Sequence, residues 1–294
     1  MDTNHSQGLE AEVRQTAQPA LLIRSVHRIY QERFWRWFGI MVPASLLAGL
    51  VVTLAEQRVR AIFSSIPRGQ AAQHYLDILA GNAIRFGSFF VSWLLGCFAL
   101  AAIASVISGF DAREEQADWA HDSYQRAREH FGPIAVTAFI TLWAFTLCGV
   151  IFGIFEIAAL RALFGRSVYR HSLALRLLGY VFVGSAISWL GASIPLVLRD
   201  DVTVWAALKK SMKLSRGYQG ALFLLVVESV AGSCIAWYGV VHGLPLLVPH
   251  GWQYPVWYGW LVRLVALLAS AAVEPPLFIG FSFLADPQRF QSSI

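Results

Sequence analysis

Charge is scarce in this sequence. Only 14% of its 294 residues are Asp, Glu, Lys or Arg, whereas hydrophobic residues make up 56%. A soluble domain usually has about 25% charged residues, because a surface that faces water needs them. Several apolar stretches are longer than the roughly 18 residues with which a helix can cross a bilayer. The scarcity of charge therefore excludes a soluble globule, a disordered chain and a collagen-like rod, and it predicts a membrane protein that crosses the bilayer several times.

Cysteine is rare as well, and familiar catalytic motifs are absent from the sequence. Cys97, Cys148 and Cys234 lie in apolar stretches, without the spacing of a disulfide framework or a zinc site. There is no GxSxG elbow, HExxH helix or Walker-type phosphate loop. We therefore predict no catalytic, cofactor-binding or metal-binding residue and no cofactor, and we favour a non-enzymatic role.

The apolar stretches predict an all-α fold with about six transmembrane helices. Helices are expected because backbone amides in lipid must be satisfied within each segment, and no alternating ten-residue strand pattern occurs. The predicted spans lie near residues 38–55, 84–107, 134–160, 175–198, 221–248 and 256–283. They divide the chain into a cytoplasmic tail (1–37), one membrane domain (38–286) and a short cytoplasmic tail (287–294).

Basic residues are distributed unequally between the two sides of the membrane. With the amino terminus inside, fourteen of the 23 Lys and Arg residues fall in cytoplasmic segments and six in outer loops. Cytoplasmic loops normally carry this excess, so both termini are predicted to lie in the cytoplasm and the protein in the plasma (cytoplasmic) membrane. The net charge of +5 is explained by loops that face anionic lipid, and no nucleic-acid partner is expected. An oligomer is compatible with the sequence.

The cytoplasmic segments before the first, third and fifth spans have the spacing of amphipathic helices. Their apolar residues recur at steps of three and four, which suits helices that lie in the membrane interface. These residues are Ile23, Val26, Tyr30, Phe34 and Trp37, then Ala117, Ala120, Tyr124, Ala127 and Phe131, and finally Val202, Trp205, Leu208 and Met212. Two explanations stay open: three copies of one helix-and-hairpin unit, or the general tendency of loops between spans to be amphipathic.

The segment from Asp200 to Gly217 has the most distinctive pattern in the chain. An acidic pair is followed by an apolar helix, by Lys209-Lys210-Ser211 and by Leu214-Ser215-Arg216-Gly217. This pattern resembles the six-span membrane domain of bacterial glycerophosphoryl diester phosphodiesterases and of related integral membrane proteins. The resemblance implies the six-span architecture but transfers little function. The phosphodiesterase itself would need a further soluble barrel with metal ligands, and no segment here is long or polar enough to form one.

Six ionisable residues lie inside the predicted spans, where charge is costly and is a functional hypothesis by default. Four of them lie toward the outer side, where arginines can reach the interface and pair locally. The other two, Glu228 and Glu274, lie roughly 8 Å to the cytoplasmic side of the midplane, with no basic residue near in sequence. The four outer residues are Arg85, Glu156, Arg176 and Arg263.

Glu228 and Glu274 are the candidate site for a proton or cation. Two carboxylates at similar depth are hard to keep ionised together in a low dielectric. Pro275-Pro276 follows Glu274 and would free backbone carbonyls, as in the broken helices of transporters. The alternative is structural: each glutamate bonds to a neighbouring helix, and the prolines only kink the sixth span.

Three functions remain open from the sequence. The first is a non-enzymatic integral membrane protein that contacts anionic lipid head groups or a partner through Lys209, Lys210, Lys213 and Arg216. The second is a proton- or cation-linked transporter that uses Glu228 and Glu274. The third is a membrane enzyme that modifies lipid, which only the family resemblance suggests.

Overall fold

The described part of the chain is built entirely from helices. The computed structural model describes residues 19–66, 74–108, 119–164, 173–200, 202–246 and 256–286, and every regular element in these ranges is a helix. Five helical stretches in them are long and apolar enough to cross a membrane. The protein is therefore an all-α, multi-pass membrane protein, which confirms the fold class predicted from the scarcity of charge. The predicted tail at 287–294 and the first 18 residues lie outside the described ranges.

The membrane-crossing helices occupy most of the predicted spans. They are α2 (Phe34–Ser64), α3 (Tyr75–Ser108), α5 (Phe131–Phe164), α9 (Gln219–Leu246) and the pair α10 (Val256–Ala271) and α11 (Pro275–Ala285). Helix α2 continues past the predicted end at residue 55. There, Glu56 and Arg60 form an i,i+4 ion pair of 3.3 Å, which supports a helix beyond its apolar stretch.

The region of the fourth predicted span is divided into two helices. Helix α6 (Leu173–Leu190) ends at a turn of two residues, and α7 (Ser193–Asp200) follows. The turn begins at Gly191, where an added Cβ would lie 2.1 Å from the ring of Phe281 in α11. Only a residue without a side chain allows this approach, so the bend and the packing of α11 depend on each other.

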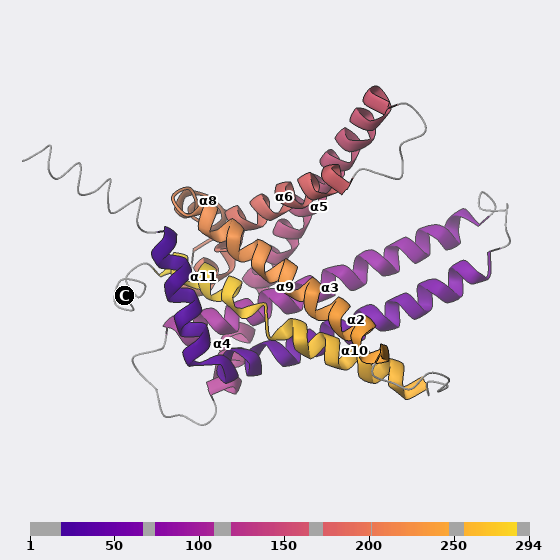
Figure 1. Cartoon of the computed structure of the whole chain (residues 1–294). Helices are drawn as coiled ribbons and strands as arrows, with labels where there is room; N and C mark the ends of the chain where they lie inside the picture. The colour runs from indigo at the N-terminus through magenta and orange to yellow at the C-terminus, as the bar shows by residue number, and fades with distance from the viewer. Residues whose placement is uncertain are drawn as a thin grey trace, which may run out of the picture.

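Three short amphipathic helices gather at one end of the bundle. They are the N-terminal helix (residues 19–32), α4 (Trp119–Glu129) and α8 (Val204–Ser215). Figure 1 shows them around α11, while the far ends of α2, α5 and α9 extend away from this end. Each amphipathic helix overlaps a segment whose spacing predicted it.

The hydrophobic core lies at this same end. It joins Val26 of the N-terminal helix, Trp37 of α2, Ile103 of α3, Leu225 of α9 and Phe281 of α11, all of which are almost completely buried. The N-terminal helix therefore packs its apolar face against other helices of the protein and does not bury it in the interface alone.

Candidate functional site

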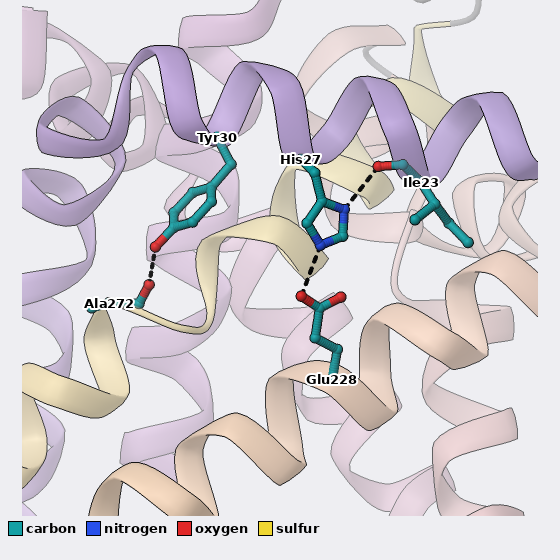
Figure 2. A network of polar contacts seen from close by, with 5 residues as sticks. All are labelled: Ile23, His27, Tyr30, Glu228 and Ala272. Carbon is teal, nitrogen blue, oxygen red and sulfur yellow. Dashed lines mark hydrogen bonds and ion pairs between the residues drawn. The ribbon is translucent and has the colours of Figure 1, made fainter.

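The N-terminal helix lies across α9 and across the break between α10 and α11. Figure 2 shows two of its side chains pointing toward these elements. The hydroxyl of Tyr30 donates a hydrogen bond to the carbonyl of Ala272, within the break. One turn earlier, His27 faces Glu228 of α9, with Nε2 2.8 Å from the carboxylate oxygen Oε1. These contacts join the amino-terminal segment to both of the last two membrane spans.

The pairing of His27 with Glu228 requires a shared proton. The other ring nitrogen, Nδ1, lies 2.9 Å from the carbonyl of Ile23, which can only accept a hydrogen bond, so Nδ1 carries a proton. Nε2 then either donates to an ionised carboxylate, as part of an imidazolium, or accepts a proton from a neutral carboxyl group. The first state is an ion pair and the second is a neutral hydrogen bond.

The surroundings of His27 favour the ion pair. Burial alone would lower its pKa, but the hydrogen bonds to Glu228 and to the Ile23 carbonyl outweigh burial, and the pKa is raised above 6.5. Burial and the nearby Glu228 carboxylate also raise the pKa of Tyr30, which keeps its hydroxyl a donor to Ala272. The charge of Glu228 is therefore balanced by a residue some two hundred positions earlier in the chain.

Glu274 lies at the break between α10 and α11, where it is the N-cap residue of α11 and makes no capping hydrogen bond. Pro275 and Pro276 follow it at the first positions of α11 and have no N–H to donate. The carbonyls of Ala271 and Ala272 thus lose their usual helical donors, and Tyr30 replaces the donor for Ala272. Within the described residues the Glu274 carboxyl group forms no hydrogen bond or ion pair.

Glu274 lines a cavity of about 520 Å³ between α2, α3, α9 and α10. Small and apolar residues such as Ala48, Val52 and Leu267 form much of its wall. Ser45 and Thr53 of α2 and Ser92 of α3 are among its polar lining residues. Ser270 and Glu274 come from the end of α10 and the break, and the remaining charged lining residues are Glu56, Arg60 and Arg263.

The structure brings the two candidate glutamates near the same helix break but directs them to different neighbours. An added Cβ on Gly232, one turn after Glu228, would lie 2.2 Å from Val273, so α9 touches the break directly. Glu228 nevertheless pairs with His27 and is not among the residues that line the cavity, whereas Glu274 is. The two carboxylates therefore have different described neighbours, and a site that uses both of them stays a prediction.

The other intramembrane charges that the structure describes lie over aromatic rings. The guanidinium of Arg85 lies 5.2 Å from the ring centre of Phe63, and that of Arg263 lies 5.9 Å from Trp260. Such contacts help an arginine at the edge of the bilayer. The side chains of Glu156 and Arg176 lie outside the described residues.

The second candidate region is the basic helix α8. Thr203 caps its first turn by accepting a hydrogen bond from the amide of Ala206. Lys209, Lys210, Lys213 and Arg216 are all exposed, and the ammonium of Lys209 lies 5.6 Å from the ring centre of Trp205, which is also exposed. The predicted basic residues thus form one outward face with an aromatic residue at its edge.

The opposite face of α8 is fastened to the bundle. Ala207, Leu208, Ser211 and Ser215 are buried. The hydroxyl of Ser211 donates to the carbonyl of Trp189 at 2.8 Å, and the Ser215 hydroxyl reaches the same carbonyl at 3.4 Å. Because these bonds fix the rotation of the helix, its basic face has a defined direction.

Among the long-range polar contacts that sequence reasoning missed, two join ionisable side chains. One is the pair of His27 with Glu228. The other links Arg199 of α7 to the end of α11, where its guanidinium donates to the Ala285 carbonyl at 2.7 Å and pairs with the buried Asp286 at 3.2 Å. From the sequence, Arg199 is only one of the fourteen basic residues assigned to the cytoplasmic side. The sequence shows only that a histidine or an acidic residue occupies a position in an amphipathic segment, and this does not identify the residue that it contacts.

Fold and site together define a multi-pass helical membrane protein with a paired carboxylate at one helix contact and an unpaired one in a cavity. The chain matches no protein-family model, no curated protein and no solved structure. Among the described residues, no three His, Cys, Asp or Glu side chains lie together as a metal site would require.

Proposed function

We propose that this protein is a non-enzymatic integral protein of the plasma membrane, with both termini in the cytoplasm, that contacts anionic lipid through the basic face of α8. The observation that supports the proposal is the fixed outward direction of Lys209, Lys210, Lys213 and Arg216 beside the exposed Trp205. Each basic residue near an anionic surface contributes about 1 kcal/mol, and an aromatic ring at the interface adds an anchor.

The test compares reconstituted proteins in neutral bilayers and in bilayers that contain anionic lipid. We expect anionic lipid to raise the thermal stability of the wild-type protein and to be retained around it. The double variant Lys209→Gln/Lys213→Gln should lose about 2 kcal/mol of this preference. Arg126→Gln/Arg128→Gln on α4 is the matched control, because it removes the same charge from exposed positions of another amphipathic helix. If both variants lose the same preference for anionic lipid, the basic face of α8 has no specific role, and the proposal is overturned.

A second candidate function is proton- or cation-linked transport through Glu274, and the cavity is the observation that favours it. Glu274 has no partner among the described side chains, and it lies in a cavity next to a broken helix. Transporters bind ions near the middle of the membrane in such arrangements. Glu228 takes a different part in this proposal: it holds the N-terminal helix in place.

Glu274→Gln and Glu228→Gln separate these roles in proteoliposomes. A pH-sensitive dye inside the vesicles reports proton movement when a proton or cation gradient is imposed. We expect Glu274→Gln to abolish the coupled movement while the protein stays folded. Glu228→Gln should retain it, because that carboxylate lies outside the cavity. Coupled movement at the wild-type rate in Glu274→Gln would exclude this candidate function.

A lipid-modifying enzyme remains a prediction of the family resemblance alone.

A further inference from the structure

The cavity beside Glu274 is larger than a proton or a bare metal ion requires. Its volume of about 520 Å³ falls within the range of roughly 300–1,000 Å³ that is typical of pockets for small organic molecules. Such pockets are mostly apolar with a few polar groups, and the small and aliphatic residues around Ala48, Val52 and Leu267 fit this description. The size of the cavity therefore favours an organic ligand.

The carboxyl group of Glu274 selects the head group of the ligand. Glu274 presents a carboxyl group that no described side chain neutralises, and Ser270 supplies a hydroxyl one turn earlier. Glu274 follows the C-terminal end of α10, where the helix dipole is negative. A primary ammonium has three N–H donors and a positive charge, and it can satisfy several of these acceptors at once.

The two arginines that line the cavity have described partners of their own. Arg60 is paired with Glu56 at 3.3 Å. Arg263 lies over the ring of Trp260, with its guanidinium 5.9 Å from the ring centre. Both guanidinium groups therefore have a described partner other than Glu274, whose carboxyl group has none among the described residues.

We propose that the cavity binds an amphipathic organic amine, with its ammonium group on Glu274 and its apolar body against α2 and Trp237. An indole ring in the wall suits an organic cation or an aromatic body, and it contributes little to a hydrated metal ion. The inference rests on the second candidate function in using the same carboxyl group, and it adds the chemical class of the ligand.

Three probes of nearly equal size and different charge test the inference: phenethylamine, 2-phenylethanol and phenylacetate. Binding of each to the full-length protein in neutral nanodiscs is measured by calorimetry. We expect the amine to bind best and Glu274→Gln to weaken it at least tenfold. Ala48→Leu, which fills the apolar wall without changing charge, should weaken the amine and the alcohol together. Glu228→Gln is the control and should leave amine binding within twofold of wild type.

The possible outcomes distinguish the binding site for an amine from the transport function. Equal amine affinity in wild type and Glu274→Gln would overturn the inference, as would tighter binding of phenylacetate, which would assign the cavity to an anion held by its arginines. Gradient-driven proton movement that depends on Glu274, together with no binding of the amine, would reject the amine and leave the second candidate function standing. Amine binding that depends on Glu274, without any coupled movement, would support the binding site and reject transport.

Discussion

Gly191 is the residue at which the chain bends between α6 and α7. The ring of Phe281 occupies the space that a side chain would need, with an added Cβ only 2.1 Å from it. Phe281 is itself almost fully buried in the core, so its ring has little room to move. A glycine in an apolar stretch otherwise carries no sign of such a contact, and the sequence led us to expect one continuous span here.

Replacing Gly191 with alanine should lower the free energy of unfolding by about 1–3 kcal/mol, because overpacking forces the ring or the backbone to shift. Thermal unfolding in detergent measures the loss. Gly149→Ala in α5 is the matched control, since an added Cβ there meets nothing within 4 Å, and it should be close to neutral. Equal stability of the two variants would contradict the role of Gly191.

For Glu274, the sequence predicted the local backbone but not the neighbouring side chains. Its position before two prolines predicted a carboxyl group at a broken helix, and the structure places it there. Which neighbours it faces was not predictable, because the cavity wall comes from α2, α3 and α9.

The N-terminal helix is the element whose role changed most between sequence and structure. Its spacing predicted an amphipathic helix in the interface. In the fold it packs Leu22 and Val26 into the core and binds the last two spans through His27 and Tyr30 (Figure 2). Trp37 at the start of α2 also donates to the Ile29 carbonyl at 3.1 Å, which ties the two helices together across Arg33.

Docking of this helix should depend on pH. The pKa of His27 is raised in the fold above its ordinary value of 6.5, so the stabilisation from its ion pair is fully present below pH 6.5 and is lost as pH rises through the raised value. Because both side chains are partly exposed, the contribution is about 1 kcal/mol or less. Glu228 is the titratable group that faces this histidine in the described contacts, and Tyr30 lies within electrostatic reach of the same carboxylate.

Hydrogen exchange across residues 19–32 measures this dependence after correction for intrinsic rates. Protection should fall between pH 6 and pH 8.5 in the wild-type protein. His27→Gln keeps a side chain that can hydrogen-bond to Glu228 but cannot titrate, and its protection should be independent of pH. A wild-type profile as flat as that of the variant would show that the ion pair does not hold the helix.

At the scale of the whole molecule, the distribution of basic residues predicts which end of the bundle faces the cytoplasm. The N-terminal helix, α4 and α8 share one end in the structure (Figure 1), in agreement with an even number of crossings between them. The orientation itself is a prediction of the positive-inside rule.

Single cysteines at Arg58, Arg126 and Lys213, in a background without the native cysteines, test the orientation. All three positions are exposed. A membrane-impermeant maleimide should label position 58 on intact cells and positions 126 and 213 only after the cells are opened. Labelling of position 213 from outside would reverse the predicted topology.

The sequence by itself determined that the chain lies in a lipid bilayer, that its fold is all-α and where its amphipathic helices form. Composition and periodicity are local properties of the chain, and lipid imposes helices on any long apolar segment regardless of its neighbours. Tertiary structure alone decided that Glu228 pairs with His27, that Glu274 faces a cavity and that the chain bends at Gly191. These outcomes depend on side chains brought together from distant parts of the chain, and no local pattern specifies which helix faces reach contact distance.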